Sequence, residues 1–444
     1  MAGISGVRGV VGKSLTPDIA LKYSSAFGNL CRSGKVVVGR DSRTSGEMMK
    51  SAVISGLSST GCQVIDLGIC ATPTVEIAVP GLKAQGGIII TASHNPIQWN
   101  ALKFVDSDGI FLSPKENQKL FVLVQNDRIK YQPWNKIGKV SSDSTWSKKH
   151  IEKILRLKYV NVKLIRQRKF KVVLDCCNGA GGVVSPDLLK ALGCKVIEFN
   201  CQPNGLFPHD PEPIPRNLVS LCQWVKKHHA DLGFANDPDV DRLAIVSEKG
   251  VPLSEEATLA LVTRFILGKK PMSHVVTNIS TSRMIEDIAT EFDSKVYRTK
   301  VGEAHVARKL KQVKGVIGGE GNGGVILPEL HCGRDALVGM ALILEFLVES
   351  GKSMSLLASE LPRYFMVKEK AKLTQNFEKN LSQLKRKYSQ GRINSLDGLR
   401  INYDDFWLQV RKSNTEPQVR IITEARSKYE AGKLVADALK ILNS

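Results

Sequence analysis

The stretch Leu232-Gly233-Phe234-Ala235-Asn236-Asp237-Pro238-Asp239-Val240-Asp241-Arg242 decides the fold. A short apolar run that ends in a polar loop is typical of a buried parallel strand whose carboxyl end borders a ligand cleft. The chain repeats this arrangement twice: Gly87-Ile88-Ile89-Ile90 precedes Thr91-Ala92-Ser93-His94-Asn95-Pro96, and Gly315-Val316-Ile317-Gly318 precedes Gly319-Glu320-Gly321-Asn322-Gly323-Gly324. We therefore expect three similar units, each with one polar loop at the cleft.

Two further strand-like runs precede each loop in the same order. They cover residues 36–39 and 61–65 in the first unit, 172–175 and 193–197 in the second, and 275–278 and 294–297 in the third. Helix-forming segments separate the runs, as in residues 186–192, which Gly193 is expected to end. Strands that alternate with helices predict layered α/β units with mostly parallel sheets.

The residues beyond Pro362 follow a different pattern. A lysine-rich stretch, a turn at 396–398, two strand-like runs and a terminal helix indicate a small α+β domain. Polar residues at 141–144 and a turn at 247–250 indicate the other boundaries. We predict three similar layered α/β domains with mostly parallel sheets, and a smaller C-terminal α+β domain, around a central cleft. Their predicted bounds are 1–145, 146–248, 249–362 and 363–444.

The composition argues against several classes of protein. The chain of 444 residues is too long for one hydrophobic core. It has no uninterrupted run of about 18 apolar residues, so no membrane span is expected, and its start does not resemble a signal peptide. The nine cysteines are scattered without C-x-x-C spacing, which favours a reducing, cytoplasmic location.

The formal charge of +20, from 63 basic and 43 acidic residues, raises the question of nucleic-acid binding. No nucleic-acid-binding motif accompanies the charge, and the basic residues are spread along the whole chain. We therefore expect no nucleic-acid partner. A solvated basic surface is the simpler interpretation, and it would also favour small anionic substrates.

The aspartate loop carries a metal-type pattern. Asp237, Asp239 and Asp241 alternate after a strand, and residues two apart in an extended segment point to one side, where three carboxylates can bind one hard cation. A calcium loop of EF-hand type is an alternative, with Glu248 at its twelfth position. Position six, however, is Arg242 where that loop needs glycine, and the following apolar residues continue as a strand. Magnesium is therefore favoured.

The two other loops offer weaker signals. Ser93 lies in a turn closed by Asn95-Pro96, where exposed backbone N–H groups can hold a phosphate; a helix-capping serine is the alternative. A serine hydrolase is disfavoured, because no G-x-S-x-G elbow occurs and His94, adjacent in sequence, is poorly placed as a base. Glu320 and Asn322 can bind sugar hydroxyls, although a tight structural turn explains the glycines as well.

A last cluster lies near the C-terminus. Its guanidiniums, hydroxyls and amide are suited to a phosphate, because the fork of an arginine matches phosphate oxygens. The cluster consists of Arg411, Ser413, Asn414, Thr415 and Arg420. An ordinary strand-end turn is the alternative.

These motifs together resemble the α-D-phosphohexomutase superfamily. T-A-S-H-N-P resembles its phosphoserine loop, D-P-D-V-D-R its magnesium loop, G-E-G-N-G its sugar loop and R-K-S-N-T-E-P its phosphate loop. Residues 3–9 and 39–46 resemble its first-domain signatures, so the match spans nearly the whole chain in the family's order. The family fold, three similar α/β domains and a smaller fourth around a central cleft, agrees with the predicted units.

The resemblance implies a phosphoryl transfer. Ser93 would pass a phosphoryl group to a hexose monophosphate, and the resulting hexose 1,6-bisphosphate would return its other phosphoryl group to the serine. One Mg²⁺ per chain would be bound by Ser93, Asp237, Asp239 and Asp241. Arg242 would assist, and proton transfer or charge stabilisation around the serine would involve Arg8, His94 and Lys103, with the identity of the base left open. The non-reacting phosphate would be held by Arg411, Ser413, Asn414, Thr415 and Arg420.

Two departures from the family pattern bear on the substrate. Asn322 stands where many members have serine, and Glu303 stands where mannose- and glucose-type bacterial members often have histidine. Residues 301–304 and the G-E-G-N-G-G loop resemble members labelled phosphoglucosamine mutase, which implies interconversion of glucosamine 6-phosphate and glucosamine 1-phosphate. A phosphomannomutase or phosphoglucomutase, or a sugar-phosphate-binding protein without turnover, is the alternative. Hexose phosphates are the expected partners, and the expected assembly is a monomer or a homodimer.

Overall fold

One four-strand arrangement occurs three times in the computed structural model, which describes residues 2–3, 6–412 and 418–442. In each unit the first strand lies between the second and third and runs parallel to both, and the fourth pairs with the third in antiparallel orientation. The strands are β3 (Lys35–Arg40), β4 (Gln63–Ile69), β5 (Gly86–Ile90) and β6 (Trp99–Asp106); β8 (Lys171–Asp175), β9 (Lys195–Phe199), β10 (Leu232–Asn236) and β11 (Leu243–Ser247); and β12 (His274–Asn278), β13 (Lys295–Thr299), β14 (Ile317–Glu320) and β15 (Gly324–Ile326).

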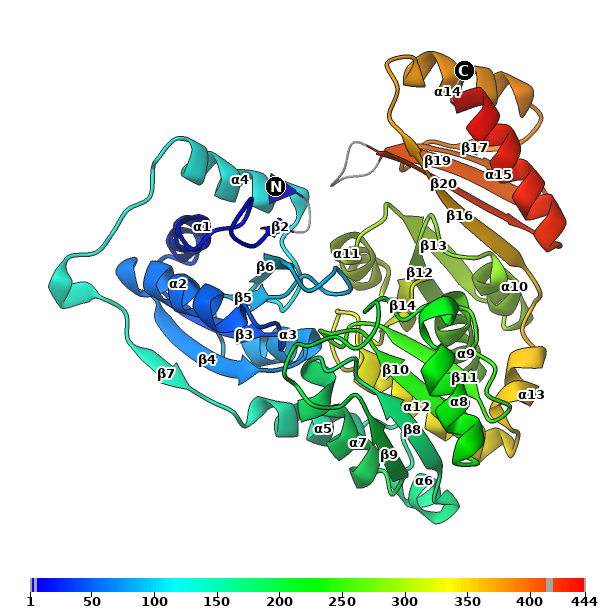
Figure 1. The fold of residues 1–444 in the computed structure, drawn as a ribbon, viewed down its shortest axis with the longest axis horizontal. Coiled ribbons are helices and arrows are strands. Elements are labelled where there is room, and N and C mark those ends of the chain that lie inside the picture. Colours follow the sequence, from blue (N-terminus) through cyan, green and yellow to red (C-terminus); the bar gives the residue numbers. More distant parts are fainter. Residues whose placement is uncertain (1, 4–5, 413–417, 443–444) are drawn as a thin grey trace.

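The three predicted layered α/β units are thus confirmed (Figure 1). The sequence did not indicate the antiparallel fourth strand in the first and third units. This strand matters for the site, because it makes each loop a connection between two buried, hydrogen-bonded strands.

The first unit has the widest sheet. Antiparallel strands β1 (Ala2–Gly3) and β2 (Gly6–Val10) extend it beyond β6, and β7 (Val140–Ser142) extends it beyond β4. Val36 and Val38 of β3 pack with the residues of α1 (Pro17–Leu30) and α2 (Gly46–Ser59), whereas Val37 packs with those of α3 (Thr72–Gly81). Because successive side chains of a strand point to opposite faces, helices cover both sides of this sheet.

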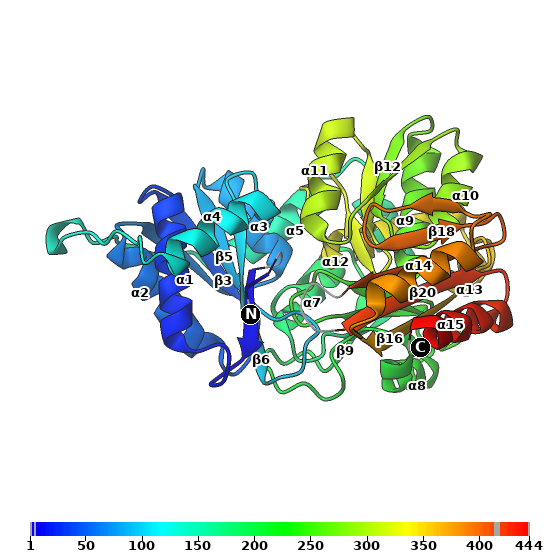
Figure 2. The ribbon, with the colours of Figure 1, turned by 90° about the horizontal axis from the view of Figure 1, so that it is seen from above.

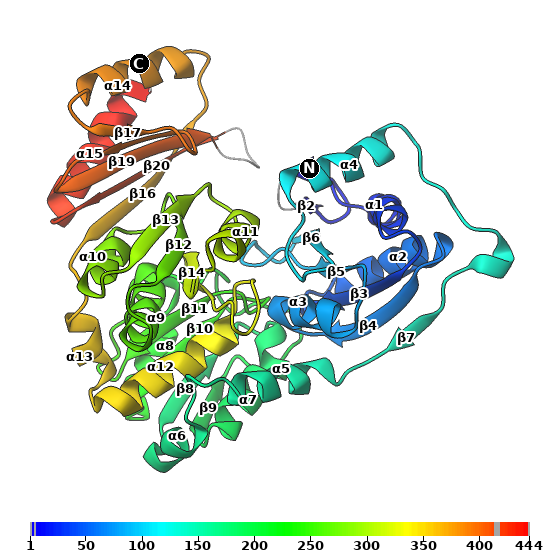
Figure 3. The same cartoon turned by 180° about the vertical axis from the view of Figure 1, so that it is seen from behind.

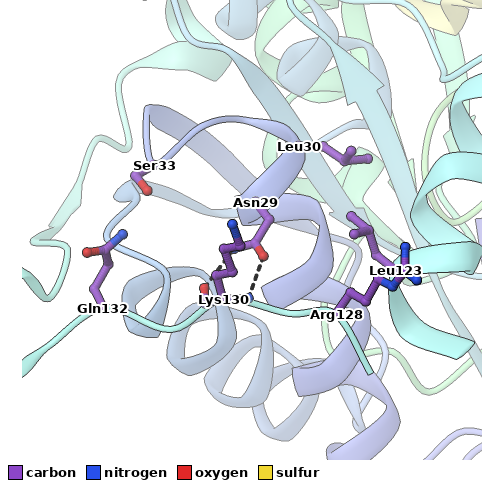
Figure 4. A pocket seen from close by; sticks show the side chains of 7 residues that line it. All are labelled: Asn29, Leu30, Ser33, Leu123, Arg128, Lys130 and Gln132. Atoms are coloured by element: carbon purple, nitrogen blue, oxygen red, sulfur yellow. Dashed lines mark hydrogen bonds between the residues drawn. The ribbon is translucent and has the colours of Figure 1, made fainter. Parts of the chain in front are cut away.

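Helix α4 (Pro114–Gln125) also belongs to the first unit, and its start is fixed by a capping box between Ser113 and Glu116. A pocket lies between the end of α1 and the segment after α4 (Figure 4). Asn29 accepts a hydrogen bond from the backbone N–H of Lys130 at 2.7 Å and donates to its carbonyl at 2.9 Å. None of the pocket's lining residues belongs to the three loops, so it is separate from the candidate site.

The second and third units share one hydrophobic core. Their helices are α5 (Trp146–Leu155), α6 (Val162–Arg168), α7 (Ser185–Ala191), α8 (Val219–Lys227), α9 (Glu255–Lys269), α10 (Met284–Glu291), α11 (Glu303–Val313), α12 (Ala336–Ser350) and α13 (Met354–Ser359). Helix α12 is apolar on nearly all sides and lies across both units (Figure 3), which joins them into one packed body. The expected helix before Gly193 is α7, and this glycine has a φ of +79°.

The C-terminal domain is a five-stranded antiparallel sheet with the order β16-β20-β19-β18-β17. Its strands are β16 (Phe365–Lys372), β17 (Arg392–Asn394), β18 (Leu399–Asn402), β19 (Phe406–Lys412) and β20 (Gln418–Ala425), and its helices are α14 (Phe377–Lys387) and α15 (Lys428–Leu442). The predicted smaller α+β domain is therefore confirmed. It lies on the same side of the molecule as the second and third units (Figure 2). Within the described part of the chain, no helix is long and apolar enough to cross a membrane.

Candidate active site

The loops that follow β5, β10 and β14 meet at one buried place. The hydroxyl of Ser93 donates a hydrogen bond to Asp237 Oδ2 at 2.7 Å, across 144 residues of sequence. Arg334 contacts both Asp241 and Glu320, at 2.5 and 2.9 Å. The structure therefore brings the serine, aspartate and glycine-rich loops into direct contact, as expected for parallel strands whose carboxyl ends border one cleft.

Ser93 is held in a constrained turn. Its φ is +50°, and its backbone N–H donates to the hydroxyl of Thr91 at 2.9 Å. The carbonyl of Ser93 accepts a hydrogen bond from Arg43 at 2.6 Å, and the buried Asp41 binds both Arg43 and Thr91. A residue other than glycine at positive φ persists only where its surroundings enforce it, so this network fixes the direction of the serine hydroxyl.

The aspartates converge for a different reason from the one that their spacing suggested. The loop is not extended: Val240 has a φ of +65°, and its N–H donates to the carbonyl of Asp237 at 3.1 Å, which closes a turn. Asp237 Oδ1 also accepts the N–H groups of Asp241 and Arg242, each at 3.1 Å. A tight turn around a buried valine, and not strand-like alternation, therefore gathers the carboxylates.

The triad of Asp237, Asp239 and Asp241 is suited to a hard cation. Its three carboxylates are buried, and one oxygen from each lies within 4.8 Å of the others. Asp239 Oδ1 and Asp241 Oδ1 are buried without a hydrogen-bond partner among the described residues. Buried, unpaired carboxylate oxygens are costly unless a cation is present, so the donor set fits a bound divalent metal.

The acidities within the triad also indicate an excess of buried negative charge. Burial, and then the charges of Asp241 and Asp239, raise the pKa of Asp237 well above its usual value. Burial would also raise the pKa of Asp239, but the charge of Lys103, whose Nζ lies 2.7 Å from Asp239 Oδ2, and hydrogen bonds from Asp237, Lys103 and Thr72 together hold that pKa well below its usual range. One carboxylate of the triad is thus paired with a lysine, and the charged form of another is disfavoured by burial and by its acidic neighbours.

The four predicted basic groups surround Ser93 and the triad. Lys103 lies between Asp239 and Asp241, Arg8 donates to Asn95 at 2.8 Å, and Arg242 lies 3.5 Å from Glu212 and 3.8 Å from Asp241. His94 Nδ1 lies 3.3 Å from the hydroxyl of Ser93. The histidine is therefore better placed for proton transfer than expected for a residue adjacent in sequence.

His94 and Lys103 differ in charge. Burial lowers the pKa of His94 well below its usual value, and Arg242 and Arg8 lower it further. Burial would lower the pKa of Lys103 too, but Asp239 and Asp241 raise it above its usual value. A neutral imidazole therefore lies within reach of the serine oxygen, while Lys103 stays cationic beside the carboxylates of the triad.

The glycine-rich loop holds its acidic side chain firmly. Glu320 Oε1 accepts hydrogen bonds from Asn278 at 2.8 Å and from the N–H of Gly302 at 2.9 Å, and Oε2 pairs with Arg334. Burial raises the pKa of Glu320, but Arg334 and Asn278 outweigh it and lower the pKa below its usual value. Asn322 is half-buried, and its side-chain oxygen accepts the N–H of Gly324 at 3.2 Å.

Arg334 was absent from the sequence-based set of site residues. It follows Gly333 in the loop before α12, and its other partner is Glu303, at 2.9 Å. Burial, and then Glu76, raise the pKa of Glu303 well above its usual value, although Arg334 opposes this. The only sequence signal for Arg334 was an Arg-Asp pair just before an apolar helix, which does not reveal contacts with distant carboxylates.

The C-terminal cluster is only partly described. Arg411 and Arg420 lie directly opposite each other on β19 and β20. Arg411 is buried, its Nε has no hydrogen-bond partner among the described residues, and burial and then Arg420 lower its pKa. Two adjacent guanidiniums of this kind favour a bound anion. The predicted phosphate ligands Ser413, Asn414 and Thr415 lie outside the described residues.

The two described members of the cluster, Arg411 and Arg420, are not bonded to the three loops. Within the described ranges, no hydrogen bond or ion pair joins Arg411 or Arg420 to Ser93, the aspartate triad or Glu320. The connection runs through the domain interface, where Asp397 accepts the N–H of Val301 at 3.0 Å and Ser280 donates to Gln409 at 2.6 Å.

Comparison with known proteins gives consistent matches along the chain. Residues 1–129, 148–250 and 254–365 match the phosphoglucomutase/phosphomannomutase alpha/beta/alpha domains I, II and III, and residues 364–441 match the C-terminal domain of the same family. The chain is 41% identical to a "Phosphoglucomutase/phosphomannomutase" of Thermococcus kodakarensis over 99% of its own length and 98% of the relative's. It is 39% identical to a "Probable phosphoglucosamine mutase" of Methanopyrus kandleri, over 97% and 95% of the two chains. A crystal structure of a phosphoglucomutase/phosphomannomutase family protein from Burkholderia thailandensis superposes with a TM-score of 0.87 at 28% identity, covering 99% of this chain and 97% of that one.

Proposed function

The chain belongs to the phosphoglucomutase/phosphomannomutase family of phosphohexomutases, and we propose that it interconverts glucosamine 6-phosphate and glucosamine 1-phosphate. The acidic pair Glu303 and Glu320 is the observation that supports glucosamine over glucose or mannose as the sugar. Together with Asp241 they share the single guanidinium of Arg334, so three buried carboxylates face one arginine and a further cation would be favoured beside them. The ammonium group on C2 of glucosamine supplies such a charge, whereas the hydroxyl of glucose or mannose does not.

The reaction proceeds through a phosphorylated serine. The phosphoryl group on Ser93 Oγ passes to the free hydroxyl of the hexose monophosphate, so one P–O bond breaks at the serine and another forms at the sugar. The resulting hexose 1,6-bisphosphate turns over within the cleft, and its other phosphoryl group returns to the serine. The fixed turn at Ser93 keeps the oxygen in line with the bound sugar, which is the main contribution that a protein makes to phosphoryl transfer.

The neighbouring side chains manage protons and charge. Neutral His94, 3.3 Å from Ser93 Oγ, takes the proton of the serine hydroxyl when this oxygen attacks the bisphosphate and gives it to the sugar oxygen that loses the phosphoryl group. In the opposite transfer the proton of the sugar hydroxyl passes through His94 to Ser93 Oγ. Lys103 remains charged and, with Arg8 and Arg242, stabilises the charge on the phosphoryl oxygens. Asp237, Asp239 and Asp241, with the phosphoserine, would hold one Mg²⁺, which when bound offsets the same charge.

The remaining loops bind the substrate. Arg411 and Arg420, with the predicted ligands Ser413, Asn414 and Thr415, grip the phosphate that does not react, in either orientation of the sugar. Glu320 and Asn322 bind sugar hydroxyls. In this arrangement phosphate affinity comes from the C-terminal domain and sugar recognition comes from the third unit.

A phosphoglucomutase/phosphomannomutase activity is the second candidate, because the Thermococcus relative that bears this name is 41% identical. The two proposals are separated by measuring kcat/KM for the 6-phosphates of glucosamine, glucose and mannose with one enzyme preparation. We expect the highest value for glucosamine. A higher value for glucose or mannose would replace the first proposal by the second, and binding of all three without turnover would indicate a sugar-phosphate-binding protein.

A further inference from the structure

Arg334 lies where the loops meet, and we infer that it is a positioning residue that couples metal binding to sugar binding. The inference rests on the proposed function, because it takes the aspartate triad as the metal site and the loop of Glu320 as the sugar site. The loop motifs do not include this arginine, and the proposed function uses it only as a charge shared by three carboxylates.

The geometry around Arg334 uses each of its three nitrogens for a different segment of the chain. Nη2 lies 2.5 Å from Asp241 Oδ2 in the aspartate loop, and Nη1 lies 2.9 Å from Glu320 Oε2 in the sugar loop. Nε lies 2.9 Å from Glu303 Oε2 at the start of α11. All four residues are buried, with exposed fractions of 8% or less. Charge-assisted hydrogen bonds in such a site are strong and weakly screened, so the three segments are held as one unit.

The fold holds Arg334 in place from both sides. Its side chain passes over Gly324, where a Cβ would lie 2.3 Å from Arg334 Cδ, so the glycine provides the space for the arginine. The next residue, Asp335, caps α12 by accepting the N–H groups of Leu337 and Val338. The N–H of Asp335 donates to the carbonyl of Val325 in β15, which ties the arginine to the strand that follows the sugar loop.

The consequence for the metal site follows from the two oxygens of Asp241. Oδ2 is occupied by Arg334, with Lys103 3.7 Å away, whereas Oδ1 has no hydrogen-bond partner among the residues that the structure describes. Arg334 therefore occupies one oxygen of this carboxylate and leaves Oδ1, which Arg242 Nε approaches only to 3.8 Å, as the oxygen available to a cation. A metal that fixes Asp241 also fixes Arg334 and, through it, Glu320 Oε2. The sugar phosphate then binds to a Glu320 carboxylate whose conformational entropy has already been lost. Metal binding and sugar binding therefore strengthen each other.

Only arginine can make this connection. A guanidinium is planar and offers five N–H donors in a fixed fork, whereas the ammonium of lysine is a point charge. Arg334→Lys keeps the charge that balances the carboxylates but cannot contact Asp241, Glu303 and Glu320 together with the same geometry. The variant therefore separates the charge of residue 334 from its bridging role.

The test measures the dissociation constant of Mn²⁺, by electron paramagnetic resonance of the free ion, with dephosphorylated enzyme in the absence and in the presence of saturating glucosamine 6-phosphate. In the native protein we expect the sugar phosphate to tighten Mn²⁺ binding about five- to tenfold. In Arg334→Lys we expect this factor to fall close to one while both ligands still bind. Arg264→Lys is the matched control, because its guanidinium contacts Glu291 and the carbonyl of Glu360, outside both loops, and it should retain the native factor.

The outcomes separate this inference from the proposed function. A native protein that binds neither Mn²⁺ nor glucosamine 6-phosphate would refute the proposed function. A native protein that binds both without coupling, or an Arg334→Lys protein that retains the coupling and only melts at a lower temperature, would overturn the inference alone. If Arg334→Lys does not fold, Gly324→Ala provides the same test, because the added methyl group displaces the arginine from its position. Retained coupling in that variant would also overturn the inference.

Discussion

The candidate site has two halves that differ in how their charges are balanced. The first half contains Ser93 and the aspartate triad, and the second half contains Arg411 and Arg420 in the C-terminal sheet. Around Ser93 and the aspartate triad, buried cations have carboxylate partners: Lys103 pairs with Asp239, Arg43 with Asp41 and Arg334 with Asp241. In the C-terminal sheet, Arg411 and Arg420 face each other, and no described carboxylate forms an ion pair with either of them. The first half is organised before substrate arrives, as transition-state stabilisation requires. The second half has like charges side by side and gains most from binding an anion.

The largest effect should follow from a change at the centre of the first half. Ser93→Ala removes the oxygen that would carry the phosphoryl group in the proposed mechanism, so we expect mutase activity to fall at least about a thousandfold, as for other lost nucleophiles. Intact mass and peptide mapping of the native protein should find one labile phosphate at Ser93. Ser24→Ala, which changes a buried serine that bonds to the carbonyl of Leu21, should retain both phosphate and activity. Phosphate mapped to another residue of active protein would refute the mechanism.

A metal ligand should rank next. Asp239→Asn reduces the negative charge of the triad and weakens the pair with Lys103, so kcat should fall about a hundred- to a thousandfold, with a much smaller change in KM. The exposed Asp210→Asn is the control and should behave like the native enzyme. Chelator should abolish turnover, and added Mg²⁺ should restore it. Full activity in excess chelator would show that the triad has another role.

A change in the second half should affect binding instead of chemistry. Arg411→Ala removes a charge-assisted contact with phosphate, which is worth about 1.5–3 kcal/mol, or about ten- to a hundredfold in affinity. The loss should be similar for the phosphates of glucosamine, glucose and mannose, because all share this group. Lys412→Ala, on the same strand but paired with Glu378 at the surface, is the matched control. Isothermal titration with each sugar phosphate measures the effect, and a loss confined to kcat would contradict the division between the halves.

The sequence predicted which loops form the first half, but it did not predict the backbone path of the aspartate loop or the contacts of Arg334. Ligand sites lie at the carboxyl ends of parallel strands, so three polar loops after three apolar runs indicated that Ser93, the aspartates and Glu320 face one cleft, although their strands belong to three separate sheets. The path of the aspartate loop was mistaken, because the backbone of Val240 takes a conformation that is uncommon for a β-branched residue. The sequence pattern did not reveal Arg334, because its partner Asp241 lies 93 residues away and such a contact depends on tertiary packing.

The smallest effect should come from Asn322, in the glycine-rich loop of the third unit. The amide oxygen of Asn322 accepts the N–H of Gly324, which leaves its amide N–H groups as donors towards the sugar. Asn322→Ser shortens the side chain and replaces the amide by a hydroxyl. One neutral hydrogen bond is worth about 0.5–1.5 kcal/mol, so the ratio of kcat/KM for glucosamine to that for glucose should change by about two- to tenfold. Arg411→Ala should leave this ratio unchanged, since it acts on the phosphate. If Arg411→Ala shifted the sugar preference and Asn322→Ser did not, the C-terminal domain would recognise the sugar, and the roles proposed for it and for the third unit would be wrong.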